Sequence, residues 1–242
     1  MALLEVDGVS KVFGGVQAVR TMQVSVEEGV IQGIIGPNGS GKTTFLGLLS
    51  GTFRPDGGSI RLAGRRLDGL SAHRTVKEGV ARTFQTTRLF ASWPLAANIR
   101  LAAEEHRTGG SARSGTYAGL TLERILALAG LDERGGEICA SLSNAEQRLA
   151  MIAVAVATRP VLLLLDEPAV GMSPTEAGDL ARVIRRIRDE LAITVMIVEH
   201  NMHFMMGLAD RILAMNAGAK LAEGTPAEVR RDPDVIASYL GG

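Results

Sequence analysis

The stretch IQGIIGPNGSGKTT, residues 31–44, joins a strand pattern to a glycine-rich loop. Residues 31–35 form a short apolar run typical of a buried strand, and an apolar helical pattern begins at Phe45. The residues between them have the spacing G-x-x-x-x-G-K-[ST] of a phosphate-binding loop. This motif requires a strand before it and a helix after it, so the context disfavours an incidental glycine-rich turn.

The residue types of this loop suit phosphate binding. Glycines let the backbone curl until several N–H groups point inward, and the following helix adds the positive end of its dipole. Lys42 can reach the outer phosphates of a nucleotide, and the Thr43 hydroxyl can ligate Mg²⁺. The phosphate-binding residues that we predict are Gly36, Pro37, Asn38, Gly39, Ser40, Gly41, Lys42, Thr43 and Thr44.

The composition limits the classes of partner. The 242-residue chain carries 26 Lys+Arg and 26 Asp+Glu, and this zero net charge argues against broad electrostatic binding to nucleic acid or anionic lipid. The single cysteine, Cys139, cannot form an internal disulfide and fits a reducing compartment. The N-terminal residues do not resemble a signal peptide, and no apolar run approaches the roughly 20 residues that span a bilayer. We expect a soluble or peripheral protein that reaches a membrane only through a partner.

Strand patterns occur along most of the chain. Residues 161–165 and 193–198 are continuous apolar runs, which is typical of strands buried on both faces. Residues 3–9 alternate more loosely and predict an edge strand. Further strands are expected at residues 18–26, 59–62, 81–85, 211–215 and 220–223.

Helix patterns separate these strands. Two capping boxes, S-x-x-E, predict helix starts at Ser143 and Ser173, and apolar spacing predicts another helix over residues 121–131. Strands that alternate with helices indicate an α/β fold with a mainly parallel sheet, into which an all-helical segment is inserted. The predicted domains are a nucleotide-binding core of residues 1–88 and 158–242, with a C-terminal extension from about residue 225 to 242, and a helical subdomain of residues 89–157.

Polar residues follow two of the buried strands. Asp166 can hold Mg²⁺ through water, and Glu167 can orient or deprotonate a water that attacks a γ-phosphate. His200 follows another strand and could steady that water or bind the γ-phosphate. Taken singly, the acidic pair could be a solvated turn and the histidine structural. With the phosphate-binding loop, they favour nucleotide hydrolysis.

These motifs together resemble the ATP-binding subunit of ABC transporters over essentially the whole chain. The order and spacing match the Walker A loop, Q-loop, signature motif, Walker B strand, D-loop and H-loop of that family. The resemblance implies a P-loop NTPase (RecA-like) core with an N-terminal antiparallel β portion. The matching residues are GPNGSGKTT (36–44), Gln85, LSNAEQ (142–147), LLLLDEP (162–168), VGMS (170–173) and His200.

A narrower resemblance is to the ATPase subunit of branched-chain amino acid importers. Related importers of amides, urea or aromatic acids share the same extended strings, so the solute stays open. The strings are ARTFQTTRLF (81–90), LDEPAVGMSPTE (165–176), IVEHNMHFMMGLADRI (197–212) and LAEGTPAEVRRDPDVIASYLG (221–241).

The resemblance also implies roles for single residues. Phe13 would stack on adenine, and Gln85 would contact Mg²⁺ and the attacking water. Ser143, Ala145 and Glu146 would complete the site of a second subunit, so that two chains enclose two ATP molecules head to tail. Residues 88–93 would dock the helices of two transmembrane permease subunits, with Leu89, Phe90 and Trp93 forming an apolar groove or part of the subdomain core.

Ala145 departs from the family, which has glycine at this position. Its methyl group would crowd the partner's γ-phosphate, and a positive φ would add backbone strain of roughly 1 kcal/mol. We therefore predict an asymmetric dimer with a second, different ATPase subunit. The resemblance further implies a solute-binding protein as an indirect partner and a position at the cytoplasmic face of the inner or plasma membrane.

Three alternatives are weighed against this interpretation. Ala145 could mark a regulatory subunit that only binds ATP, although the intact Glu167 argues against it. A soluble ABC ATPase that works on ribosomes or DNA is disfavoured by the single cassette and the absence of a basic region. A small GTPase is disfavoured because no N-K-x-D guanine motif occurs.

Overall fold

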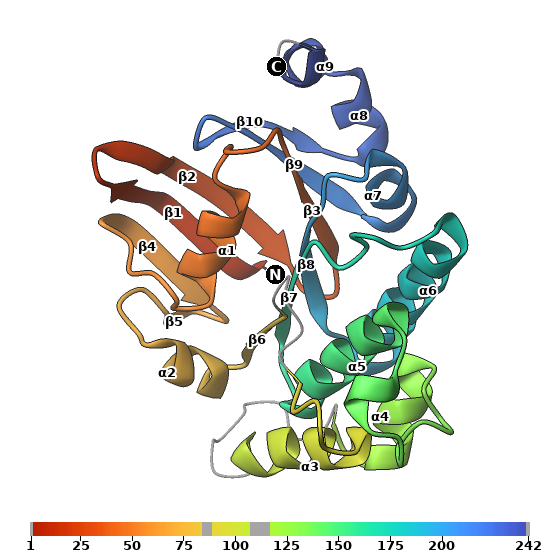
Figure 1. The fold of residues 1–242 in the computed structure, drawn as a ribbon. Coiled ribbons are helices and arrows are strands. Elements are labelled where there is room, and N and C mark those ends of the chain that lie inside the picture. Colours follow the sequence, from red (N-terminus) through yellow and green to blue (C-terminus); the bar gives the residue numbers. More distant parts are fainter. Residues whose placement is uncertain (1, 84–88, 107–116, 241–242) are drawn as a thin grey trace.

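The computed structural model describes residues 2–83, 89–106 and 117–240 (Figure 1). Its centre is a six-stranded sheet of order β10-β9-β3-β8-β7-β6, in which only the β9–β10 pair is antiparallel. This confirms the mainly parallel α/β fold. The strands are β3 (Ile31–Ile35), β6 (Val80–Arg82), β7 (Leu162–Asp166), β8 (Thr194–Val198), β9 (Arg211–Asn216) and β10 (Ala219–Gly224).

A second sheet, of order β2-β1-β4-β5, is antiparallel throughout and accounts for the expected N-terminal β portion. Helix α1 (Lys42–Leu49) lies between the two sheets, where Phe45 and Leu46 are fully buried in the core that both sheets share. The strands are β1 (Ala2–Phe13), β2 (Val16–Glu27), β4 (Gly57–Leu62) and β5 (Arg65–Arg66), and helix α2 (Ala72–Lys77) follows them.

The expectation that residues 3–9 form an edge strand is wrong. β1 pairs with β2 on one side and with β4 on the other, so it lies inside its sheet. Alternation of apolar and polar residues reports one buried face of a strand, and it carries no information about how many strands pair with it.

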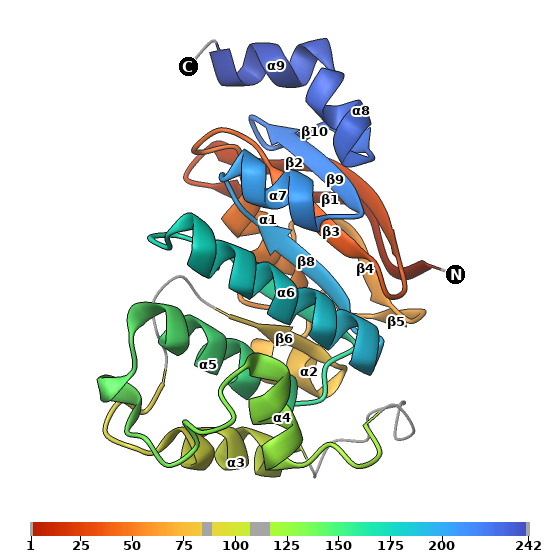
Figure 2. The same ribbon diagram turned by 90° about the vertical axis from the view of Figure 1, so that its right-hand side faces the viewer.

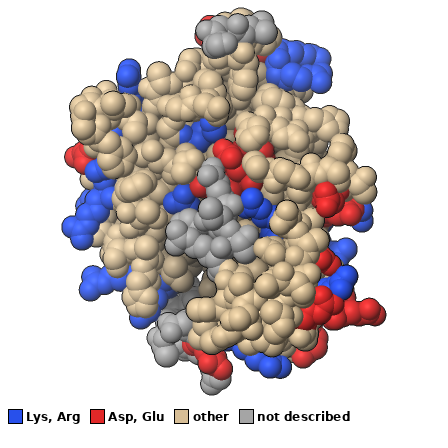
Figure 3. Space-filling model, viewed as in Figure 1, with Lys and Arg blue, Asp and Glu red and all other residues tan. Residues whose placement is uncertain are grey.

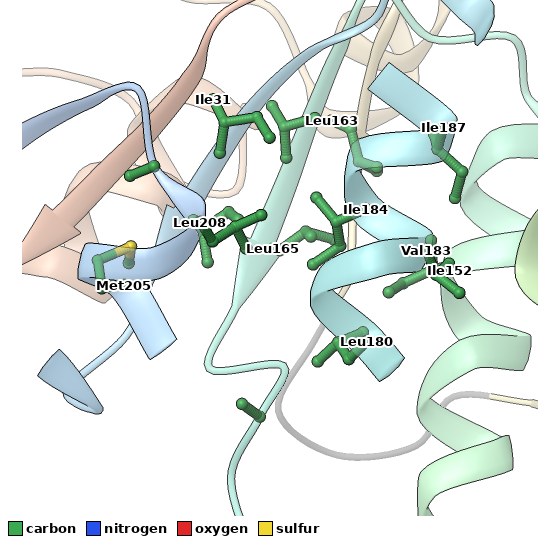
Figure 4. Packing of buried hydrophobic residues seen from close by; sticks show 14 of the residues in the cluster. Ile31, Ile152, Leu163, Leu165, Leu180, Val183, Ile184, Ile187, Met205 and Leu208 are labelled. Atoms are coloured by element: carbon green, nitrogen blue, oxygen red, sulfur yellow. The ribbon is translucent and has the colours of Figure 1, made fainter. Parts of the chain in front are cut away.

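Helices cover the opposite face of the central sheet. α6 (Pro174–Leu191) lies across this face (Figure 2). Its residues Leu180, Ile184 and Ile187 share one apolar cluster with Leu163 and Leu165 on β7. Figure 4 shows Ile184 beside Leu165. Because strands of the central sheet are covered on both faces, their sequences are continuous apolar runs. The other helices on this side of the molecule are α7 (Met202–Leu208), α8 (Pro226–Arg231) and α9 (Pro233–Leu240).

A group of helices between β6 and β7 has its own apolar cluster, which includes Leu95, Ile99, Leu126 and Ala153. Cys139 lies in this cluster, and burial raises the pKa of its thiol. The domain boundaries at residues 88 and 157 stay predictions. The helices are α3 (Leu95–His106), α4 (Leu122–Ala129), the 3₁₀ turn η1 (Cys139–Ser141) and α5 (Asn144–Ala157).

The capping boxes at Ser143 and Ser173 are confirmed, and each begins its helix as expected. Thr225 and Glu228 form a third box at the start of α8. Within residues 2–83, 89–106 and 117–240, every helix falls short of the length or the hydropathy that a membrane span requires.

Candidate active site

The phosphate-binding loop connects β3 to α1, and its glycines are required by close backbone packing. A Cβ atom at Gly36 would collide with the carbonyl oxygen of Met215, and one at Gly41 would collide with that of Ala18. Gly41 also has a φ of 96°, a conformation that glycine adopts at little cost. The loop is therefore held between β9 and the start of β2.

Lys42 begins α1 and its residue is only 6% exposed. Its ammonium group donates to the carbonyl oxygens of Gly36, at 2.7 Å, and Pro37, at 2.9 Å. Burial lowers the pKa of Lys42, and the nearby carboxylates of Glu167 and Asp166 oppose that shift. The loop thus fixes a cationic group at the position where the motif requires one for phosphates.

A cavity of about 400 Å³ opens over this loop. Arg20 from β2 and Glu167 from the end of β7 line it together with the loop, so cationic and acidic groups face the same space. Figure 3 shows basic and acidic side chains side by side near the centre of this face. The sequence did not predict several residues of the lining: Val16, Gln17, Ala18, Arg20 and Ala217.

Asp166 ends β7 and is buried, with 3% of its side chain exposed. One carboxylate oxygen accepts a hydrogen bond of 2.8 Å from Arg82, a neighbour that the sequence did not predict. The other oxygen, Oδ1, has no hydrogen-bond partner among the residues that the structure describes. A buried carboxylate oxygen without a donor is a fitting ligand for a hard cation or for its bound water.

This observation supports the expected Mg²⁺ site. Thr43, whose side chain is exposed beside Lys42, supplies the hydroxyl oxygen that such a site needs. Hydroxyl and carboxylate oxygens are the ligands that Mg²⁺ prefers. The donor set of Thr43 and Asp166 fits the ion.

Glu167 and His200 are brought together as the sequence predicts. Oε1 of Glu167 lies 3.8 Å from Nδ1 of His200, and the histidine side chain is 56% exposed. Glu167 has a φ of 49°, uncommon for a residue with a side chain, and its N–H donates to the carbonyl of Val198. Such backbone strain clusters at functional sites. The Glu167 carboxylate therefore lines the phosphate cavity beside the imidazole of His200.

Other predicted residues lie outside this cavity. Phe13 is 41% exposed, packs edge-on against Phe53 at 5.1 Å and does not line the cavity. Ser143, Ala145 and Glu146 lie at the start of α5 and do not line it either. Gln85 falls outside the described residues.

Ala145 does not carry the strain that a positive φ would have added. Asn144 is the first helical residue of α5, so Ala145 occupies its first turn, and it is not among the residues with positive φ. Only the steric argument, that a methyl group replaces a hydrogen atom, is left for this position. Glu146 accepts from the Ser143 N–H at 2.8 Å and pairs with Arg134 at 3.0 Å, so its carboxylate is already engaged in capping the helix.

Of the three residues expected in the apolar groove, only Leu89 packs against the helical cluster. Phe90 and Trp93 are 53% and 43% exposed and stack on each other at 4.8 Å. Asn98, which is buried, accepts from the Phe90 N–H and donates to the carbonyl of Pro94, and this fixes the turn that carries both rings. The core interpretation therefore fits Leu89 alone.

Residues 19–170 match the family model described as ABC transporter. The chain belongs to the ABC transporter family. It is an ATP-binding and ATP-hydrolysing cassette, as the six motifs predict. A second family model, described as Branched-chain amino acid ATP-binding cassette transporter, matches residues 219–242 of this ABC protein.

Relatives of this ABC cassette align with almost its whole length. The high-affinity branched-chain amino acid transport ATP-binding protein BraF of Pseudomonas aeruginosa is 40% identical, and the alignment covers 99% of this chain and 98% of BraF. LivG of Escherichia coli K12, which carries the same description, is 37% identical with the same coverage. The ADP conformation of MJ1267, a cassette of an ABC transporter, superposes with a TM-score of 0.87 at 26% identity, and all of both chains is covered.

Proposed function

We propose that this chain is the ATPase subunit of an importer of branched-chain amino acids, or of related amino acids and amides. The observation that carries this proposal is the likeness to BraF and LivG over 98% or more of every chain. The separate match of residues 219–242 to a branched-chain amino acid cassette model supports it.

In the proposed reaction, water attacks the γ-phosphorus of ATP and the bond to the ADP oxygen breaks. Glu167 accepts a proton from that water, and His200 holds the water or the γ-phosphate beside it. Lys42 binds the outer phosphates. Mg²⁺, when bound by Thr43 and Asp166, would neutralise charge on the phosphates. Gln85 is proposed to contact the ion and the water.

The catalytic unit is proposed to be a dimer. Ser143, Ala145 and Glu146 do not line the cavity of their own chain, which suits a role in a partner's site. The first turn of α5 presents N–H groups and the positive end of a helix dipole, which attract a phosphate. Because this chain carries Ala145 there, we propose that its partner is a different ATPase subunit. Each ATP would be enclosed head to tail between the chains, with Phe13 against the adenine.

The docking surface for the permease subunits is proposed at Phe90 and Trp93. Two exposed rings held by a rigid turn are an unusual apolar feature for a surface, and such features mark protein interfaces. An apolar cavity of about 220 Å³, lined by Leu89, Met151 and Val154 among others, lies in the same part of the molecule. Contact with two permease subunits there would hold the chain at the cytoplasmic face of the inner membrane, with a solute-binding protein as an indirect partner.

The test is capture of the chain from native membranes in mild detergent. We expect two multi-span membrane proteins and a second ATPase to accompany it, and the associated binding protein to retain a branched-chain amino acid. A double variant, Phe90→Ser with Trp93→Ser, should lose the membrane proteins and keep ATP binding. The matched control, Ile236→Ser, removes an exposed apolar group from α9 and should retain them. A chain recovered alone, as a regulatory subunit of another assembly, or on ribosomes would overturn the transport proposal.

A further inference from the structure

Glu199 is a buried carboxylate that has no part in the hydrolytic reaction proposed above. It follows β8 directly and its residue is 1% exposed. Among the described residues it forms no ion pair, although a buried carboxylate usually has a cationic partner. Three backbone N–H groups surround it instead.

These three contacts connect two segments of the active site. Oε1 accepts from the N–H of Ala169, at 2.8 Å, two residues beyond Glu167. Oε2 accepts from the N–H groups of His200 and Asn201, at 3.1 and 3.2 Å. One side chain therefore joins the segment that carries Glu167 to the segment that carries His200.

Only a carboxylate satisfies this arrangement. Every partner is a hydrogen-bond donor, so both terminal atoms of the side chain, Oε1 and Oε2, must accept. A glutamine has the same shape, but its NH₂ group would face an N–H group at one end and lose a bond there. An aspartate keeps the charge and both acceptors, but it is one methylene shorter and cannot reach both segments without a shift of the backbone.

We infer that Glu199 is a positioning residue for ATP hydrolysis, which fixes the distance between Glu167 and His200 by binding the backbone of both segments. The inference rests on the roles proposed above for those two residues. The strained φ of Glu167 agrees with it, because a strained conformation persists only where the surroundings hold it. A substitution of Glu199 should leave the affinity for ATP unchanged, since the phosphate loop makes none of these contacts.

The experiment compares variants of the full chain within the membrane assembly captured through it. Glu199→Gln should lower kcat about tenfold to a hundredfold and leave the KM for ATP within about twofold, as expected for loss of an interaction made mainly in the transition state. The kcat of Glu199→Asp should lie between that of the wild type and that of Glu199→Gln. The control is Glu228→Gln, because Glu228 also binds a backbone N–H, that of Thr225, at a helix remote from the catalytic groups.

A second comparison separates positioning from general stability. In a chain that already carries Glu167→Gln, the further change Glu199→Gln should have almost no effect on residual turnover, because the group it positions is gone. Multiplicative losses in the double variant, a normal kcat for Glu199→Gln, or a parallel loss of kcat and ATP affinity would each overturn the inference. A normal kcat for Glu167→Gln alone would instead overturn the catalytic role proposed for Glu167.

Discussion

The guanidinium group of Arg82 donates a 2.8 Å hydrogen bond to the carboxylate of Asp166 across neighbouring strands of the central sheet. Both side chains are buried, at 8% and 3% exposure. Arg82 also donates to the hydroxyl of Ser50, at the end of the helix that follows the phosphate loop. The pair therefore fixes the Walker B carboxylate against two elements that border the nucleotide cavity.

Removal of Arg82 should lower the free energy of unfolding. Arg82→Met leaves Asp166 buried without its cation, which typically destabilises a protein by about 3–5 kcal/mol. Urea unfolding of the full chain would measure this loss. Arg65→Met is the matched control, because Arg65 pairs with Glu78 on the surface, where a pair contributes about 0–1 kcal/mol. An Arg82→Met loss no larger than that of the control would contradict a stabilising role for the buried pair.

Loss of the proposed base should separate binding from hydrolysis. Glu167→Gln removes the group that accepts the proton, and general-base catalysis is typically worth about 10²- to 10⁴-fold. We expect turnover to fall by that factor while ATP affinity is retained, as measured by phosphate release and equilibrium binding. His200→Ala should act in the same direction. His203→Ala, an exposed histidine in the next helix, should leave turnover unchanged. Equal effects of the two histidine variants would refute the assignment.

The sequence predicted those features that neighbouring residues determine. The phosphate loop is a contiguous motif, and the runs at residues 161–165 and 193–198 reveal strands that are buried on both faces. Capping boxes marked helix starts because both partners lie within one turn. The interior position of β1 escaped prediction, since pairing with β4 depends on residues about fifty positions away.

The same contrast between neighbouring and distant residues explains which active-site residues were predicted. Glu167 and His200 were predicted because each follows an apolar strand, and the carboxyl ends of parallel strands lie at one edge of the sheet. Arg82 was missed because its partner Asp166 is 84 residues away and the pair depends on the register between β6 and β7. Glu199 was missed because its partners are backbone N–H groups, which leave no mark in the sequence.

The capping box of α5 should make this helix start sensitive to acid. Hydrogen bonds from the backbone N–H and the hydroxyl of Ser143 lower the pKa of Glu146 below its usual 4.5. A lowered pKa in the folded state means that the carboxylate stabilises the protein fully above pH 4.5 and loses this effect as pH falls through the folded value. Glu146→Ala should cost about 1 kcal/mol near pH 7, a typical capping contribution, and less below pH 4.5.

Unfolding of wild type and variant across this pH range would measure the difference. Glu133→Ala removes an exposed carboxylate nearby and serves as the control, for which we expect little effect at any pH. A Glu146→Ala difference that stays constant on acidification would show that the carboxylate charge does not contribute to the cap.

Ala145→Gly tests whether the methyl group of the signature motif weakens the partner's site. Removing it should let the N–H of residue 145 approach the partner's γ-phosphate and should raise turnover at that site, measured as the fraction of bound ATP hydrolysed in a single turnover of the captured dimer. The variant should also lose up to about 1 kcal/mol of stability, because glycine disfavours helices.

Ala227→Gly is a matched control, since Ala227 likewise follows the first residue of a helix that begins with a capping box. It should show the same loss of stability with no gain in turnover. If Ala145→Gly and Ala227→Gly changed stability and turnover equally, steric crowding at residue 145 could not be the source of an asymmetric dimer.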